Sequence, residues 1–430
     1  MDTLIWLYRI LLNLAIPFGL ISLLLRGFKN PQYWSRWSER FGFASPEIKS
    51  NAPFDLWLHA VSVGEARAAA PLIKRLLLEQ PDCNILVTTT TPTGSAMVKM
   101  MLKDTVSHCY FPYDLAWAMN KFVDIVSAKT VLIMETEIWP NMIAAVHRSG
   151  ATLVYTNVRL SERSYSSYAK FPALVKRTLG MVDHFAVQGK LDRKHLQLLG
   201  VEAAKISETG SIKFDVNVPP SLRESAEVMR RQLGPDRLIW IAGSTREGEE
   251  GKILSVYKSL KEDFPSLLLL LVPRHPERFD YMARKVQRRG LKCVRRTENI
   301  AELEGDVDVF LGDTMGELSL MYASSDVAFV GGSLEPLGGQ NILEPCALGV
   351  PVVFGPHMFN FPDISRWTIK EGAGRMVDDE QGLEQAIAEL LANPSLRDEM
   401  GGKGVAFIEA HRGALEKNFN LIEQISKSKA

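Results

Sequence analysis

Short apolar runs alternate with helical patterns along most of the chain. From about residue 55, each run is rich in Val, Ile or Leu and ends in a polar or glycine-bearing turn, which is typical of parallel strands buried on both faces. Helical patterns such as 66–79 and 141–150 lie between the runs. The alternation predicts an α/β protein with two parallel sheets. The predicted strands are 55–61, 84–90, 130–137, 152–158 and 184–189 in the first half, and 238–244, 267–273, 307–313, 326–332 and 350–356 in the second.

The alternation is interrupted at residues 215–221, where Pro219 and Pro220 are typical of a linker. The tail, residues 396–425, is predicted to be helical around a break at three glycines (Gly401, Gly402 and Gly404), and it could cross back over the first domain. The predicted divisions are an N-terminal membrane anchor with a juxtamembrane segment (1–45), a first Rossmann-like domain (46–218), and a second Rossmann-like domain with the C-terminal helices (219–430).

The N-terminus has a different pattern from the rest of the chain. The uncharged segment between Arg9 and Arg26 reads "ILLNLAIPFGLISLLL", and extended back to Leu4 it approaches the ~20 residues of a membrane-spanning helix. Asn13, Pro17 and Gly19 weaken that interpretation, so a helix lying at the membrane interface remains an alternative, as does a signal peptide. Basic residues after the segment predict that this side stays in the cytoplasm. Membrane anchoring is favoured over a soluble core helix.

Composition narrows the class of protein. The 430 residues are 46% hydrophobic and 23% charged, with 50 basic and 50 acidic residues, so no overall positive charge is present to attract nucleic acid. The four cysteines, Cys83, Cys109, Cys293 and Cys346, stand singly, without the spacing of a zinc site. We therefore expect them to be reduced and buried in a cytosolic protein.

The segment "LHAVSVGEARAAAPLI", residues 58–73, contains a candidate catalytic acid. Ser62 and Glu65 are three residues apart where a strand becomes a helix, which fits a capping box. The same position at the carboxyl end of a strand is where open α/β sheets bind ligands, so Glu65 is either a helix cap or a catalytic base. His59, on the same strand, is interpreted as a packed histidine rather than a catalytic one.

A second candidate site lies in the glycine-rich segment "VGGSLEPLGGQN", residues 330–341. The chain contains neither the GxGxxG nor the GxxxxGK[ST] phosphate-binding motif. The segment instead follows an apolar run and precedes a predicted helix, whose N-terminus could receive an anion. Glu344, in that helix's first turn, either stabilises the helix dipole or accepts hydrogen bonds from a ribose.

Eight short motifs occur in order along the chain. They are "HAVSVGE" (59–65), "TTTTPTGS" (88–95), "METEIWPN" (134–141), "GSIKFD" (210–215), "AGSTREGEE" (242–250), "LVPRHPERF" (271–279), "GDTMGEL" (312–318) and "GGQNILEP" (338–345). In this order they resemble the motifs of the 3-deoxy-D-manno-octulosonic acid (Kdo) transferases, which are glycosyltransferases of the GT-B class. The resemblance implies two Rossmann-like domains facing a central cleft, preceded by a membrane-anchoring helix. It also implies transfer of Kdo, with inversion, from CMP-Kdo to the lipid A precursor (lipid IVA) in lipopolysaccharide core synthesis, releasing CMP at the cytoplasmic side of the inner membrane.

The resemblance also implies roles for individual residues. Glu65 would be the catalytic base, Lys213 would stabilise charge in the transition state, and Glu135 would be a second catalytic acid. From the neighbouring sequence alone, Lys213 could equally be a solvated lysine beside the linker. Glu135 could equally be an acid that caps the next helix, and its neighbour Glu137 could change its pKa. The residues implied to bind CMP are Pro273, Arg274, Met315, Gly316, Glu317, Asn341, Ile342, Leu343 and Glu344.

No cofactor or metal is expected, because the donor has no diphosphate that would chelate one. Two positions depart from the family's common pattern: Gln340 replaces a usual His, and Arg246 adds a positive charge near the donor. Arg36, Arg40, Tyr33, Trp34 and Trp37 suit either a lipid interface or a plain juxtamembrane belt. Two other functions remain open: a membrane-associated GT-B enzyme that uses a UDP-sugar, and a non-catalytic nucleotide-binding membrane scaffold.

Overall fold

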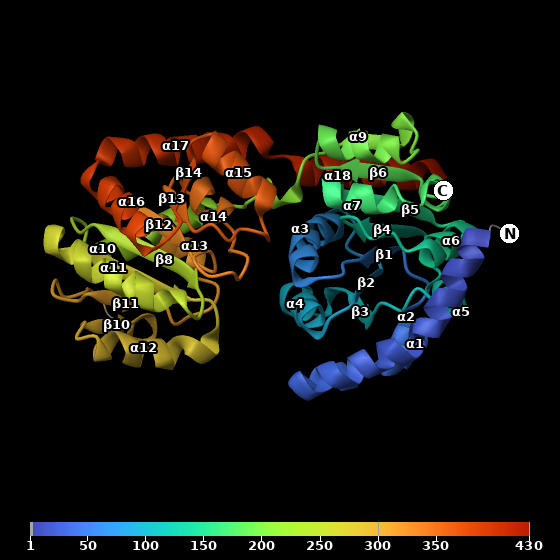
Figure 1. Ribbon diagram of the computed structural model, residues 1–430, viewed down its shortest axis with the longest axis horizontal. Helices are drawn as coiled ribbons and strands as arrows, with labels where there is room; N and C mark the ends of the chain where they lie inside the picture. The colour runs from blue at the N-terminus through green and yellow to red at the C-terminus, as the bar shows by residue number, and fades with distance from the viewer. Residues whose placement is uncertain (1–2, 300, 430) are drawn as a thin grey trace. The chain divides into compact units, whose positions relative to one another are not determined.

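The computed structural model describes residues 3–299 and 301–429. The chain divides into two compact units, the first formed by the chain up to Asp215 together with the tail from Arg412, and the second by Val216–His411. Each unit contains one parallel sheet of seven strands with helices packed around it (Figure 1). The two parallel sheets predicted from the apolar runs are therefore confirmed.

The first sheet has the strand order β3-β2-β1-β4-β5-β6-β7, and every neighbouring pair is parallel. Its strands are β1 (Leu56–His59), β2 (Ile85–Thr89), β3 (Ser107–Tyr110), β4 (Thr130–Met134), β5 (Thr152–Val158), β6 (His184–Val187) and β7 (Ile206–Glu208). The helices of this unit are α1 (Thr3–Lys29), α2 (Pro46–Asn51), α3 (Val63–Glu79), α4 (Pro92–Leu102), α5 (Ala116–Val126), α6 (Pro140–Ser149), α7 (Glu162–Tyr168), α8 (Pro172–Gly180), α9 (Lys190–Leu198) and α18 (Ala414–Lys429).

Both faces of the first sheet are buried. Trp57 and Val131 point into a core that includes residues of α5, α6 and α8, whereas Leu58 and Leu132 point into the opposite core with residues of α3 and α18. The alternation follows from the period of two along a strand. Because no face needs a polar surface, the central strands read as continuous apolar runs, which is why the sequence predicts them.

The second sheet has the order β10-β11-β9-β8-β12-β13-β14 and is also fully parallel. Its strands are β8 (Ile239–Thr245), β9 (Leu268–Pro273), β10 (Cys293–Arg295), β11 (Val309–Leu311), β12 (Val327–Val330), β13 (Val352–Phe354) and β14 (Gly374–Met376). Its helices are α10 (Pro220–Leu233), α11 (Glu249–Asp263), α12 (Phe279–Arg288), α13 (Leu318–Ala323), α14 (Leu343–Ala347), α15 (Pro362–Lys370), α16 (Glu380–Ala392) and α17 (Pro394–His411).

The C-terminal tail differs from the prediction in where it breaks. Helix α17 runs without interruption through Gly401, Gly402 and Gly404, and the chain turns only at Gly413, where φ is +97°. A Cβ at position 401 would lie 2.0 Å from the Gly349 carbonyl oxygen, so the glycine allows α17 to pack closely rather than to bend. After the turn, α18 packs on the first unit, where Phe419 and Ile422 join its core, and not on the second.

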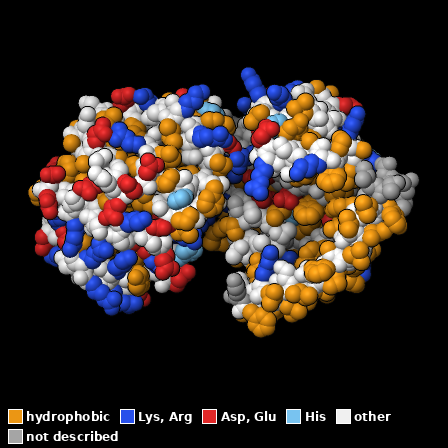
Figure 2. Space-filling view, in the orientation of Figure 1, with side chains coloured by type: hydrophobic (Ala, Val, Ile, Leu, Met, Phe, Trp, Pro, Cys, Tyr) orange, Lys and Arg blue, Asp and Glu red, His pale blue; other side chains and the backbone are white. Residues whose placement is uncertain are grey.

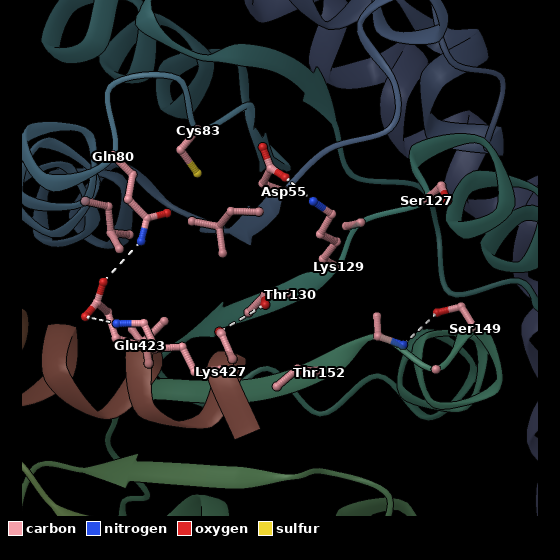
Figure 3. Close-up of a pocket in the computed structure, with 17 residues that line it drawn as sticks. Asp55, Gln80, Cys83, Ser127, Lys129, Thr130, Ser149, Thr152, Glu423 and Lys427 are labelled. Atoms are coloured by element: carbon pink, nitrogen blue, oxygen red, sulfur yellow. Dashed lines mark hydrogen bonds and ion pairs between the residues drawn. The ribbon is translucent and has the colours of Figure 1, made fainter. Parts of the chain in front are cut away.

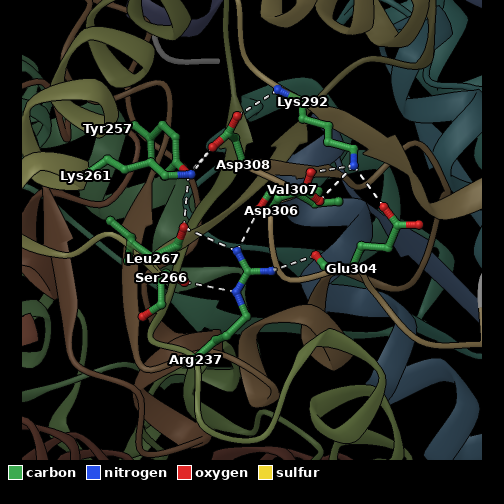
Figure 4. Close-up of polar contacts among 10 residues, drawn as sticks. All are labelled: Arg237, Tyr257, Lys261, Ser266, Leu267, Lys292, Glu304, Asp306, Val307 and Asp308. Carbon is green, nitrogen blue, oxygen red and sulfur yellow. Dashed lines mark hydrogen bonds and ion pairs between the residues drawn. The ribbon is translucent and has the colours of Figure 1, made fainter.

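A polar cluster closes the amino-terminal end of the second sheet (Figure 4). Arg237 lies just before β8, and its guanidinium donates to the carbonyl oxygens of Ser266 and Val307 at 2.9 and 2.7 Å. These carbonyls lie just before β9 and β11. One buried arginine therefore holds together the amino-terminal ends of three strands. Burial lowers the pKa of Arg237.

Helix α1 is long and apolar enough to cross a membrane by its length and composition, over Ile5–Phe28. It runs along the outside of the first unit, past α2 and α5 (Figure 1). Of the basic residues that follow it, Arg40 is buried and its guanidinium stacks on the Tyr110 ring at 4.3 Å. Arg40 therefore serves the core of the unit and is not available to a lipid headgroup.

Candidate active site

The candidate catalytic residues of the first unit lie at the carboxyl end of its sheet, around the neighbouring strands β1 and β4. The strand order changes direction between these two strands, because the chain proceeds from β1 to β2 and β3 on one side and resumes at β4 on the other. Such a switch point is where open α/β sheets bind ligands. Glu65 follows β1, Glu135 follows β4 directly, and Lys213 lies in the 3₁₀ turn Ile212–Phe214 after β7.

Glu65 is both a helix cap and a buried acid. Its Oε2 accepts a hydrogen bond from the Val61 amide at 2.7 Å, its Oε1 accepts one from the Ser62 hydroxyl at 3.0 Å, and the Ser62 oxygen accepts the Glu65 amide at 3.3 Å. Burial, reinforced by the charge of Glu135 and opposed by the Val61 hydrogen bond, raises the pKa of Glu65 to about 8. A carboxylate with a pKa near neutral is suited to general base catalysis.

Glu135 and Lys213 form an ion pair at the same edge of the sheet, with 3.0 Å between Lys213 Nζ and Glu135 Oε1. The backbone of Glu135 has a φ of +55°, a left-handed conformation that costs roughly 1–2 kcal/mol for a residue with a Cβ. The Glu135 amide continues the β4–β5 ladder by donating to the Thr156 carbonyl at 3.0 Å. The strained turn thereby aims the Glu135 side chain along the sheet edge toward Lys213.

Asn157 is a residue that the sequence analysis missed. It is fully buried near the end of β5 with a φ of +55°, and its Oδ1 accepts the Ile212 amide at 3.1 Å. Asn157 therefore fixes the turn that contains Lys213. Thr156, the residue before Asn157, accepts the hydrogen bond of the Glu135 amide. Within the described part of the chain its Nδ2 has no hydrogen-bond partner. An Asn at a strand end is a common residue in sequence, so only its long-range contact marks it.

His59 is a packed residue, as the sequence analysis favoured. It is fully buried, stacks on Phe111 with 3.8 Å between ring centroids, and has its Nδ1 2.9 Å from the Thr88 hydroxyl oxygen. Burial lowers its pKa to about 3. The imidazole is therefore neutral at physiological pH and contributes to packing beneath the acid cluster.

The predicted CMP-binding residues of the second unit lie in the loops at the carboxyl end of its sheet, after β9, β11 and β12. Its strand order changes direction between β8 and β12, as in the first sheet. Pro273 ends β9, and the next residue, Arg274, donates its amide to the Thr245 carbonyl at 2.9 Å. Burial is the largest cause that lowers the pKa of His275. The positive charge of Arg246 is the second cause, and the charges of Arg274 and Arg278 lower this pKa further. Positive charge therefore gathers at this edge.

The loop after β11 presents Met315 and Gly316 to solvent. Gly316 has a φ of +88°, and nothing would contact a Cβ placed there. The carboxylate of Glu317 is engaged within the unit, because it accepts from Arg296 at 2.9 and 3.1 Å and from the Thr314 hydroxyl. Burial opposes ionisation of Glu317, but these hydrogen bonds outweigh it and lower its pKa. Arg296, which the sequence analysis also missed, therefore holds this loop.

The segment 341–344 leads into α14 and includes its first two residues. Asn341 Nδ2 donates to Glu344 Oε1 at 3.1 Å, and Asn341 Oδ1 accepts the Leu343 amide at 3.1 Å. The side chains of Ile342 and Leu343 are fully buried, so these residues can meet a ligand only through their backbone. The part-exposed Glu344 carboxylate is the polar group that this segment offers.

The two positions that depart from the family pattern, Arg246 and Gln340, lie against the same glycine. A Cβ on Gly332, whose φ is +68°, would meet Arg246 Cγ and Gln340 Nε2, each at 3.4 Å. The buried Glu249 ties this region together, because its Oε1 accepts the amides of Arg246 and Gly332 at 2.7 and 2.6 Å. Burial raises the pKa of Glu249 to about 7.

Comparison with known proteins identifies the family. The family model described as 3-deoxy-D-manno-octulosonic-acid transferase (kdotransferase) matches residues 35–216, and the group 1 glycosyl transferase model matches residues 224–406. The chain is 39% identical over 417 residues to the 3-deoxy-D-manno-octulosonic acid transferase of Haemophilus influenzae, covering 97% of both chains. The chain belongs to the 3-deoxy-D-manno-octulosonic acid transferase family. It is also 36% identical to the Bordetella pertussis enzyme of that name, covering 89% of this chain and 90% of the other.

Solved structures agree with the GT-B fold expected for this Kdo transferase family. HepE of Anabaena in complex with UDP matches with a TM-score of 0.55 and 14% identity, over 87% of this chain and 100% of the other. The UDP-GlcNAc 2-epimerase of Neisseria meningitidis matches with a TM-score of 0.57, also at 14% identity, over 86% and 99%. At this identity the likeness concerns the fold alone. Family membership makes the protein a glycosyltransferase enzyme.

A cavity of about 590 Å³ in the first unit of this Kdo transferase family member is separate from the candidate site (Figure 3). It lies at the amino-terminal ends of β1, β4 and β5, against α18. Its charged groups are already paired, with Lys129 Nζ 2.8 Å from Asp55 Oδ1 and Lys427 Nζ 3.0 Å from Glu423 Oε2. Because ligands of open α/β sheets bind at the opposite, carboxyl ends of the strands, we assign this cavity no role in catalysis.

Proposed function

We propose that the protein transfers Kdo from CMP-Kdo to a hydroxyl group of a lipid A precursor, lipid IVA, with inversion at the anomeric carbon. The main support for the proposal is Glu65. It is a buried carboxyl with a pKa of about 8, and it lies near the Glu135–Lys213 ion pair at the point where the strand order of a parallel sheet changes direction. The names of the family relatives support the donor sugar. The lipid acceptor follows from the resemblance and from the apolar α1 on the unit that carries Glu65.

The proposed reaction is a single displacement. The Glu65 carboxylate takes the proton of the acceptor hydroxyl as its oxygen attacks the anomeric carbon of Kdo, and the bond from that carbon to the CMP phosphate oxygen breaks. CMP leaves as an anion, and the proton remains on Glu65. Lys213 stabilises the negative charge that develops, and Glu135 orients the lysine through a hydrogen bond of 3.0 Å.

The second unit is proposed to bind CMP. Arg274 would pair with the phosphate, for which the fork of a guanidinium is suited. Glu344, oriented by Asn341, would accept from the ribose hydroxyls, and the exposed Met315–Gly316 turn would approach the cytidine. Pro273, Glu317, Ile342 and Leu343 would shape these loops, since their side chains are buried or already engaged. The enzyme would act at the cytoplasmic face of the inner membrane, to which α1 would anchor it.

The test is a direct assay. Purified protein is incubated with CMP-Kdo and a tetra-acylated lipid A precursor, and the product is analysed by mass spectrometry. We expect added Kdo mass and release of CMP. In parallel, CMP and UDP are compared in a binding titration. Preference for UDP, with no Kdo added, would contradict the proposal in favour of a UDP-sugar enzyme, and nucleotide binding without any transfer would indicate a scaffold.

A further inference from the structure

Helix α1 has a narrow side that is covered and a wide apolar surface that is exposed. Ile5 and Leu23 are buried, and Leu12, Ile16 and Leu20 between them are partly buried. Seven of the exposed large apolar side chains recur every three or four residues, which places these seven on one side of the helix. They are Leu7, Leu11, Leu14, Phe18, Ile21, Leu25 and Phe28, and we call them the outer stripe. Hydrophobic side chains gather along this helix in the space-filling view (Figure 2).

Two hydrogen bonds near the start of α1 fasten it to the first unit. The Tyr8 hydroxyl donates to Asp114 Oδ2 at 2.7 Å, and Arg9 Nε donates to Asn141 Oδ1 at 2.8 Å. Both partners are buried, and they belong to one network, because the Asp114 carboxylate also accepts the amides of Asn141 and Met142 at the start of α6. The contacts are thus made to a prebuilt polar site rather than to mobile surface groups.

The far end of α1 is joined to the same unit by the turns that follow it. The Trp34 indole, from the 3₁₀ turn Pro31–Trp34, donates to the Leu24 carbonyl at 3.2 Å and packs on Gly27, where a Cβ would overlap its ring. Two residues later, the Arg36 guanidinium donates to the His108 carbonyl in β3 at 3.0 Å, which fastens this end of the helix to the first sheet. From Arg9 to Arg26 the helix rises about 25 Å, at ~1.5 Å per residue. A helix that spanned a membrane would place its two ends on opposite sides of an apolar layer ~30 Å thick, so both could not contact one soluble unit.

We propose that α1 does not span the membrane but lies in the plane of one leaflet, with its outer stripe in the boundary between headgroups and acyl chains and its inner face on the first unit. Both ends of α1 then stay on the side of the membrane that holds the rest of the protein. A helix that is apolar all round is explained in this way, because protein covers one face and lipid covers the other.

A lipid surface fits the outer stripe better than a second copy of the chain does. The stripe has the spacing of a coiled-coil seam, but such seams are flanked by charged residues that select the partner, and no charged residue occurs between Arg9 and Arg26. The flanking Trp6 and Leu24 are also exposed and apolar, which widens the surface beyond a seam. Arg26, exposed at the end of the stripe, can reach anionic headgroups.

Arrangement in one leaflet also connects the membrane with the candidate site. Asn141, which receives Arg9, lies in α6, and the loop before α6 begins with Glu135. The segment that contacts lipid therefore supports the loop that holds the Glu135–Lys213 ion pair. This connection does not depend on which substrate the enzyme uses.

Topology is tested on the full chain with one epitope tag at the N-terminus and another at the C-terminus, expressed in a Gram-negative host. Protease is added to intact spheroplasts and to inverted membrane vesicles. We expect both tags to be protected in spheroplasts and digested on inverted vesicles. Digestion of the N-terminal tag alone in intact spheroplasts would show a spanning helix and overturn the proposal.

The occupant of the outer stripe is tested with vesicles of phosphatidylethanolamine and phosphatidylglycerol. The double variant Leu14→Glu, Phe18→Glu changes side chains that are 65% and 74% exposed, so folding should be retained, which circular dichroism checks. We expect its flotation with vesicles to fall at least about tenfold, while the control Leu198→Glu, on the exposed side of α9, floats normally. Unchanged flotation of the double variant, or a loss of dimer mass in solution without loss of flotation, would overturn the proposal.

Discussion

Replacement of Glu65 by Gln separates the observed capping role of this carboxyl from its proposed role as catalytic base. Gln can still accept the Val61 amide, so the cap is largely kept, and loss of the carboxylate as a cap should cost about 1 kcal/mol or less. Gln cannot take a proton from the acceptor. We therefore expect CMP binding to persist and Kdo transfer to be abolished.

The pH dependence of stability gives a measurement that is independent of activity. The pKa of Glu65 is about 8 in the folded protein against an ordinary value of 4.5, so folding favours the neutral acid. This contribution is fully present below pH 4.5 and is lost as the pH rises through 8, at about 1.4 kcal/mol per pH unit. The Glu65→Gln variant has no such loss. The difference between the unfolding free energies of the variant and the wild type should therefore increase in favour of the variant by up to about 5 kcal/mol between pH 4.5 and 8. Above pH 8 this difference should stay constant.

The assay is urea unfolding from pH 5 to 9, followed by hydrogen exchange of peptides from β1 and β4, which report on the first unit alone. Glu79→Gln, on the exposed last turn of α3, is the matched control and should show no such gain. A difference in unfolding free energy between the Glu65→Gln variant and the wild type that stays constant with pH would refute the buried neutral acid. Normal transfer by the variant would refute the catalytic base.

Four further outcomes follow from the same contacts. Glu137→Gln should move the acidic limb of the transfer rate to lower pH, because the charge of Glu137 helps to raise the pKa of Glu65; an unmoved limb would contradict this. Asn157→Gly, which tolerates the positive φ but loses the Ile212 hydrogen bond, should lower kcat on the order of tenfold with little change in KM, whereas Asn157→Asp should restore it. Arg274→Ala should weaken CMP binding by roughly 10-fold or more in a titration, and unchanged affinity would remove it from the site. Gly401→Ala should lower the unfolding free energy of the second unit by roughly 1–3 kcal/mol, while Gly402→Ala, where nothing lies within 4 Å, should stabilise it; equal effects would refute the close contact.

The sequence predicted the central strands of both sheets but none of their edges. The four strands that it missed, β3, β7, β10 and β14, are the outermost strands of the two sheets. An edge strand pairs on one side only and is partly exposed, and β10 and β14, for example, contain no fully buried residue. Their residues therefore carry little of the apolar pattern on which prediction depends.

The sequence by itself determined the kind of chemistry, because the ordered motifs that contain Glu65, Glu135, Lys213 and the predicted CMP-binding residues are those of a known family. It could not choose between the cap and the base for Glu65, because both need the same local spacing. Only the tertiary structure showed that the capping carboxyl is also a buried acid beside a second one, as a base would require. Only it revealed Asn157, whose partner is 55 residues away. Hydrophobic periodicity records burial along one element, whereas strain, long-range hydrogen bonds and the partners of α1 depend on segments that folding brings together.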